Sequence, residues 1–263
     1  MLALRVILGV VAGLGIPFGS LYLTLHFGFN VGNATALGAA SACGLIGAVY
    51  SGVAFARGIY GLRPFSILGY VLDMSWSLLN TTASLIVWLP ACAVAGGAFV
   101  PPDDKSRRSG TFVYEKNPRD PSGRVYGATT IGTVIGGKWS SHEEMHVWQA
   151  RLFGLLYLPV YGLSWLLNVL FRLCTGRLQG LAEQAYFRIC FEDWSYSAGS
   201  TSVGDDTIKW GKWILWFFLS LIYVASVVLI FVGGFAGMMA MSIVAASVLF
   251  VYSLIRALTP PTA

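Results

Sequence analysis

Long apolar segments constrain this chain more than any other feature of its sequence. Five of them hold at most one charged residue each, at 2–25, 34–56, 66–89, 213–232 and 235–255. A helix of about 20 residues, rising 1.5 Å per residue, crosses the hydrocarbon core of a bilayer. Only 11% of the 263 residues are charged, against about a quarter in soluble domains. The sequence therefore predicts an α-helical polytopic membrane protein with about five spans, forming a single membrane domain over residues 1–263.

A polar region separates the third and fourth of these spans. Residues 101–140 contain two turn signals, Asn-Pro at 117–118 and Pro-Ser-Gly at 121–123. Strand-favouring residues flank that turn at 110–114 and 124–131. We expect a small β-hairpin at the membrane face, close to the region that carries the chemistry.

The run His-Glu-Glu-Met-His at 142–146 is the feature that points to chemistry. Two histidines four residues apart lie on one face of a helix, so both imidazoles can bind one zinc ion. Glu143, directly after His142, can take a proton from a zinc-bound water. Ser140 or Ser141 can cap a helix that begins here. The alternative is a pair of surface histidines on an amphipathic helix.

A catalytic zinc ion usually has three protein ligands and a water. Glu183, on a helix predicted over 181–194, is our choice for the third ligand. The competing acids are Glu192, Asp193, Asp205 and Asp206. The zinc-site region thus extends over 141–194.

The apolar run 152–171 decides whether Glu183 can reach the histidines. A straight helix over this run would rise roughly 30 Å, and the chain leading on to Glu183 would return only about 16 Å. Breaks at Gly154, Pro159 and Gly162 would solve this difficulty. We expect a re-entrant or in-plane hydrophobic hairpin with both ends on the side of the zinc.

His-Glu-Glu-Met-His-Val-Trp-Gln at 142–149, with Glu183 and Ala185-Tyr186 downstream, resembles the gluzincin-type zinc metallopeptidases. It is most similar to membrane-embedded bacterial proteins whose motif continues in the same way. The resemblance covers 142–186, less than a fifth of the chain.

The resemblance implies a function and a set of roles. His142, His146 and Glu183 would bind Zn²⁺, and Glu143 would act as general base and acid in the hydrolysis of a peptide bond. Tyr186, or else Arg188, would stabilise the oxyanion. The partners would be a peptide or protein substrate and membrane lipid.

Other classes of function stay open. A non-catalytic metal-binding or scaffolding membrane protein would carry the same motif. Asp73 and the glycine-rich spans also permit a transporter, although no inverted repeat is visible. Three histidines in the whole chain are too few for a di-iron desaturase.

The distribution of charged residues bears on the partners of the protein and on its orientation in the membrane. The basic residues are scattered without interleaved aromatic residues, so we expect no nucleic-acid partner, and a homo-oligomer stays open. The resemblance implies a bacterial inner-membrane protein. Most Lys and Arg residues lie within 101–212, and the positive-inside rule then places the site in the cytoplasm.

Overall fold

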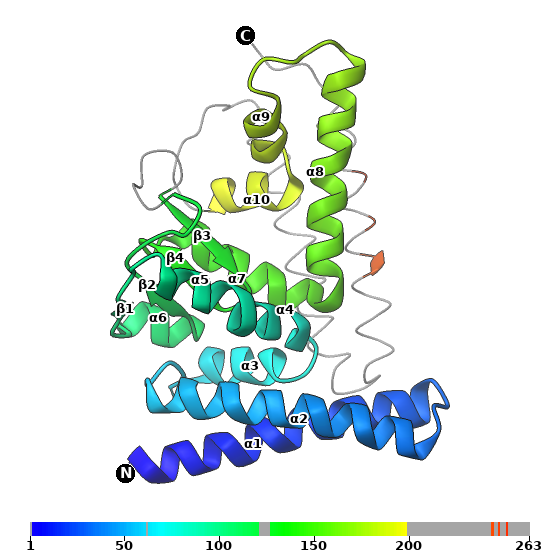
Figure 1. Ribbon diagram of the computed structural model, residues 1–263, viewed down its shortest axis with the longest axis vertical. Helices are drawn as coiled ribbons and strands as arrows, with labels where there is room; N and C mark the ends of the chain where they lie inside the picture. Colours follow the sequence, from blue (N-terminus) through cyan, green and yellow to red (C-terminus); the bar gives the residue numbers. More distant parts are fainter. Residues whose placement is uncertain are drawn as a thin grey trace. The chain divides into compact units, whose positions relative to one another are not determined.

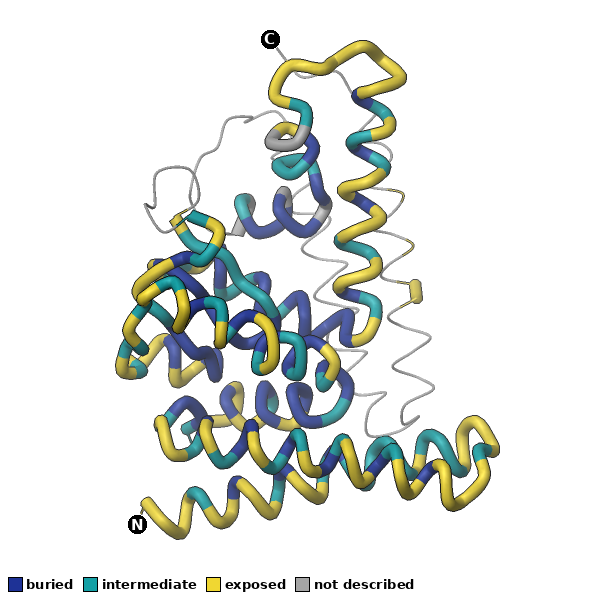
Figure 2. The backbone as a smooth tube through the Cα atoms, viewed as in Figure 1, coloured by how far each residue is buried: buried dark blue, intermediate teal, exposed yellow. Residues whose placement is uncertain are grey.

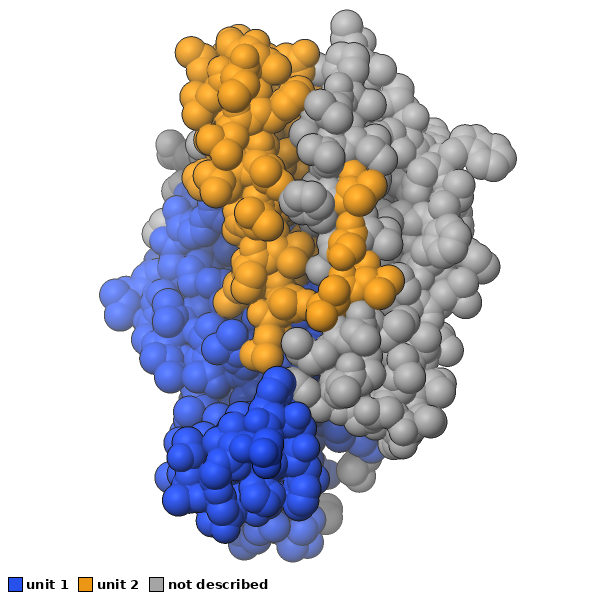
Figure 3. Space-filling model, turned by 90° about the vertical axis from the view of Figure 1, so that its right-hand side faces the viewer, with its two compact units in different colours: residues 1–154 blue, residues 155–263 orange. Residues whose placement is uncertain are grey.

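The computed structural model describes residues 2–61, 63–120 and 127–198, together with the isolated positions 243, 244, 247 and 251. The chain divides into two compact units, Met1–Gly154 and Leu155–Ala263, which Figure 3 shows in different colours. The predicted spans 213–232 and 235–255 lie outside the described residues, apart from those four isolated positions. The single membrane domain stays a prediction.

The first unit begins with two long apolar helices that lie side by side (Figure 1). These are α1 (Leu2–Leu23), continued by a π-helical turn η1 (Thr24–Gly28), and α2 (Asn33–Ala56). Glycines bring them together, because a Cβ atom on Gly47 would collide with the backbone oxygen of Gly13. Their outer faces are apolar and exposed (Figure 2).

Three helices in the described residues are long and apolar enough to cross a membrane. They comprise 2–28, 33–56 and 141–174, and a bent pair can count as a fourth. The first two agree with the predicted spans 2–25 and 34–56. A membrane protein is therefore supported, whereas five spans are not confirmed.

The predicted third span, 66–89, is not straight. It forms α3 (Pro64–Asp73) and a second helical stretch built from α4 (Leu78–Ala83), the π-helical turn η2 (Ser84–Trp88) and α5 (Leu89–Val94). The two parts meet at an angle of 83°. Polar side chains at the bend, those of Trp76, Ser77 and Asn80, bond to another helix.

That other helix is α7 (Ser141–Phe153), which carries the histidine motif. The last carbonyl groups of a helix have no partner within it. The bend in the third apolar segment supplies donors for several of them. Trp76 Nε1 donates to Leu152 O at 3.2 Å, Ser77 Oγ to Ala150 O at 3.0 Å, and Asn80 Nδ2 to Gly154 O at 2.7 Å.

A buried ion pair joins the same two elements. Arg151 on α7 donates to both carboxylate oxygens of Asp73 on α3, at 2.9 and 2.6 Å, and both side chains are fully buried. Tyr60 Oη adds a third hydrogen bond to Asp73 at 2.7 Å. The acid within the third apolar segment therefore fixes the motif helix to α3.

A four-stranded mixed sheet replaces the predicted hairpin. It contains β1 (Phe99–Val100), β2 (Phe112–Tyr114), β3 (Ala128–Ile131) and β4 (Val134–Gly137) in the order β1-β2-β4-β3, with α6 (Asp104–Ser109) between the first two strands. The expected pairing of 110–114 with 124–131 is wrong, because β4 lies between them and pairs with both.

A tight turn that the sequence analysis missed explains the difference. β3 and β4 form the hairpin through Gly132 and Thr133, and Gly132 has φ +56°, which glycine adopts without strain. The expected closeness of the hairpin to the histidine motif is confirmed, since α7 packs beside β3; its place at the membrane face stays a prediction.

The second unit contains α8 (Tyr157–Cys174), α9 (Leu181–Phe187) and α10 (Cys190–Ala198), preceded by a 3₁₀ turn η3 (Gly154–Leu156). A reversal at Pro159 or Gly162 is wrong, because α8 is one unbroken helix, whereas the chain does break at Gly154, where φ is +51°. A re-entrant or in-plane course of this segment, with both ends on the side of the zinc, stays a prediction. Pro159 is the third residue of α8, where the missing N–H costs no helical hydrogen bond. The helix predicted over 181–194 is also divided, since α9 ends before α10 begins.

Candidate metal centre

The histidine motif opens α7 as the sequence predicts. Ser140 caps the helix, with its Oγ accepting from the backbone N–H of Glu143 at 3.2 Å. His142 and His146 lie one turn apart, and both are buried, with 8% and 5% of their surface exposed. A pair of surface histidines is therefore excluded.

The geometry of the two rings fits one shared metal ion. His142 Nε2 and His146 Nε2 face each other at 3.2 Å, and the rings are nearly perpendicular at 88°. Two Zn–N bonds of about 2.0–2.1 Å at a tetrahedral angle would place their nitrogens roughly 3.3–3.4 Å apart. The observed separation therefore needs almost no adjustment to hold such an ion.

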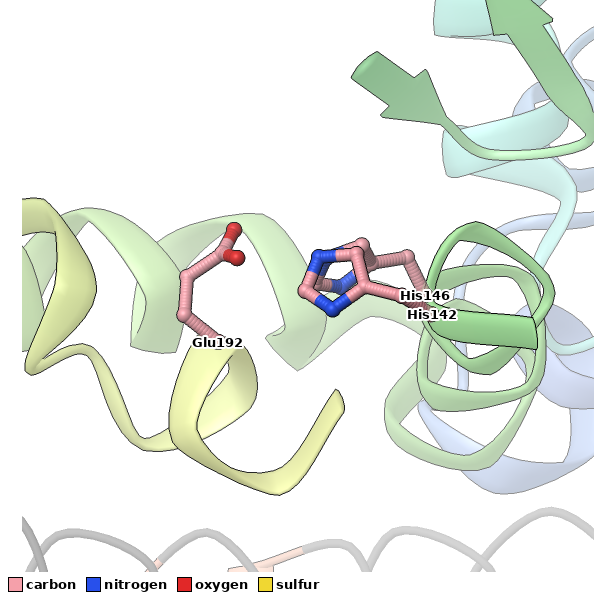
Figure 4. A group of neighbouring side chains, drawn as sticks. All are labelled: His142, His146 and Glu192. Carbon is pink, nitrogen blue, oxygen red and sulfur yellow. The ribbon is translucent and has the colours of Figure 1, made fainter. Parts of the chain in front are cut away.

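A buried carboxylate joins this pair. His142, His146 and Glu192 each offer one ligand atom, and these atoms lie within 4.8 Å of one another. Figure 4 shows the carboxylate of Glu192, on α10, directed towards the two imidazole rings. Two imidazoles and one carboxylate form a donor set typical of catalytic zinc and also suited to other divalent metals.

The sequence favours Glu183 as the third metal ligand and offers Glu192 as one of the competing acids. Glu183 falls on α9, but its side chain lies outside those that the structure describes, so that assignment stays a prediction. Within the second unit, α9 packs beside the end of α8, where Asn168 Nδ2 donates to Ala185 O at 3.3 Å. Glu192 lies beside the first turns of α8, where Tyr161 Oη donates to its Oε1 at 2.7 Å.

Glu143, the proton acceptor that the motif predicts, is held by the sheet. Its carboxylate is buried, with 6% of the residue exposed, and Oε2 accepts a hydrogen bond of 2.5 Å from Thr130 Oγ1. Thr130 is on β3, the last strand of the sheet. The strand beside α7 therefore restricts the direction in which the Glu143 carboxylate points.

One histidine has a buried partner behind it. His146 Nδ1 lies 2.9 Å from Gln149 Oε1, and Gln149 is fully buried. The sequence contained a signal for this contact, since residues three apart meet on one helix face. Thr130 and Tyr161 carried no comparable signal, because tertiary packing alone brings them to Glu143 and Glu192.

The two residues suggested as oxyanion donors lie in the second unit. Tyr186 is on α9, where its ring packs edge-on against Phe187 at 5.6 Å between centroids, and Arg188 follows the end of that helix. Both are half-buried. Their role stays a prediction.

Comparison with known proteins adds no relative. No protein-family model, no curated protein and no solved structure matches this chain. The motif and the geometry of its side chains are therefore the basis for a functional assignment.

Proposed function

We propose that this protein is a zinc-dependent membrane metallopeptidase, with His142, His146 and Glu192 as the metal ligands. The observation that carries the proposal is the pair of buried Nε2 atoms facing each other at 3.2 Å, joined by a buried carboxylate. Its chemistry is supported by Glu143, next to the first histidine in the sequence, which is the arrangement that peptidases of the resembled kind use.

The residues divide the chemical work between them. A zinc ion bound here would polarise the scissile carbonyl and lower the pKa of its bound water towards 7. Glu143 would accept the proton from the attacking water and later deliver it to the leaving amine. Thr130 keeps one oxygen of that carboxylate hydrogen-bonded to β3, and Tyr161 does the same for one oxygen of Glu192.

An extended peptide is the substrate that this architecture suits best. β3 is an edge strand of the sheet, and all four of its residues are only partly buried. Exposed strand edges bind extended peptides through main-chain hydrogen bonds. Because Thr130 on this strand bonds to Glu143, a peptide along β3 would pass close to the proton acceptor.

The experiment compares two kinds of variant in detergent-purified protein. The Glu143→Gln variant should keep its zinc and lose hydrolysis of a fluorogenic peptide library, because it removes the proton acceptor and leaves the ligands in place. The double variant His142→Ala, His146→Ala should lose both. Hydrolysis that survives in both variants would refute the proposal.

A non-catalytic metal site is the alternative that the same ligands favour. It predicts zinc in the wild-type protein and in the Glu143→Gln variant, with no zinc-dependent peptide hydrolysis in either. Reconstitution into vesicles of defined phospholipid before the assay guards against loss of activity in detergent.

A further inference from the structure

We propose that Gln149 is a positioning residue for the metal centre, whose side-chain oxygen selects the tautomer of His146 that can bind a metal. This inference rests on the proposed function, because it concerns a ligand of the same centre. It adds a residue to which the motif itself assigns no role.

The chemistry follows from one contact. Gln149 Oε1 lies 2.9 Å from His146 Nδ1, and a carboxamide oxygen can only accept a hydrogen bond. The proton of the neutral imidazole must therefore sit on Nδ1. Nε2 then carries the lone pair, and Nε2 is the atom that faces His142. Metals bind the unprotonated nitrogen, and a hydrogen bond to the other nitrogen also makes it a better donor.

The position of Gln149 stabilises the hydrogen bond between its side-chain oxygen and His146 Nδ1. Gln149 and His146 are three residues apart on α7, so they share one helix face. The glutamine side chain is fully buried. Burying a carboxamide is costly unless it is hydrogen-bonded, so its contact with the imidazole is not readily exchanged for one with water.

The tautomer can be read in the metal-free protein. The chain has only three histidines, so ¹⁵N-histidine labelling gives a simple spectrum, which His26→Gln reduces to the two motif residues. The spectra are recorded at mildly alkaline pH. We expect His146 to carry its proton on Nδ1 in the wild-type protein, and to become a mixture of tautomers in Gln149→Leu.

Zinc affinity gives the second readout. Gln149→Leu should weaken zinc binding about 10- to 100-fold, the usual effect of losing such an outer partner. Gln149→Glu should keep both tautomer and affinity, because a carboxylate oxygen also accepts from Nδ1. Gln179→Leu, the same change at an exposed residue of the turn after α8, is the matched control and should change neither.

The inference is overturned if wild-type His146 carries its proton on Nε2, or if Gln149→Leu leaves tautomer and zinc affinity unchanged. The wild-type spectrum and Gln149→Glu decide the matter even if Gln149→Leu fails to fold. If the wild-type protein binds no zinc, the proposed function fails, while the tautomer still tests the Gln149 contact separately.

Discussion

The ion pair between Asp73 and Arg151 gives a sharp prediction about stability. Asp73→Asn keeps the shape of the side chain and removes its charge. It leaves a fully buried guanidinium without its counter-ion. The asparagine also has only one acceptor oxygen for the three groups that donate to the Asp73 carboxylate, two from Arg151 and one from Tyr60. Removing one partner of a buried pair costs about 3–5 kcal/mol, and we expect a loss of that size.

The chain contains a matched control for this change. Arg63 and Asp104 form an ion pair at 3.2 Å whose side chains are 54% and 77% exposed. Solvent-exposed pairs contribute about 0–1 kcal/mol, so Asp104→Asn should change stability very little. Both variants carry the same Asp→Asn replacement, and the difference between them isolates the effect of burial.

A double variant tests whether the two charges act as a pair. Asp73→Leu with Arg151→Met removes both charges, but it also removes the donors that Arg151 offers to the carbonyl groups of Ser109 and Gly110. We therefore expect the double variant to be less stable than wild type, by about 1–3 kcal/mol for each carbonyl left unpaired. It should still be more stable than the sum of the two single changes predicts.

The assay is reversible unfolding in mixed micelles, followed by tryptophan fluorescence as the fraction of denaturing detergent rises. A loss in Asp73→Asn no larger than that in Asp104→Asn would refute the account of the buried pair. Strictly additive single and double variants would show that the two charges do not interact.

Three further variants test other parts of the structure. Gly154→Ala should destabilise the protein, because φ is +51° there and a Cβ atom would collide with the indole ring of Trp76; thermal unfolding would measure it, and an unchanged midpoint would contradict it. Thr130→Val should keep zinc content but lower hydrolysis, because Glu143 loses its hydrogen bond from β3; equal turnover would remove the proposed role of that contact. Hydrogen bonds to its side chain lower the pKa of Asp103 at the start of α6, so its contribution to stability is present at neutral pH and is lost as the pH falls through that lowered value. Asp103→Asn should flatten this acid limb below about pH 4, and an unchanged limb in an acid titration would refute it.

The sequence predicted the elements whose signals are local. Apolar length identified α1 and α2, and the cap at Ser140 with histidines four residues apart identified α7 and its buried face. Gly132 between two strand-favouring runs was also a local signal, and the expectation of a turn at 121–123 overlooked it.

The errors arose where tertiary contacts determine the structure. The third apolar segment reads as a straight span, whereas in the structure it bends where Trp76, Ser77 and Asn80 bond to the end of α7. The break between α9 and α10 likewise places Glu192 beside Tyr161 in the first turns of α8. The 18 residues of α8 rise about 27 Å. The chain that follows α8 returns to its first turns by Glu192, which accepts a hydrogen bond from Tyr161.

The most direct test of the metal centre is the zinc content of the purified protein, measured by mass spectrometry of the metal after removal of loosely bound ions. We predict about one zinc per chain in the wild type, little in the double variant His142→Ala, His146→Ala, and a reduced amount in Glu192→Gln but not in Glu183→Gln. Loss of zinc in Glu183→Gln alone would return the third ligand to α9. Equal zinc in the wild type and the double histidine variant would contradict the metal centre itself.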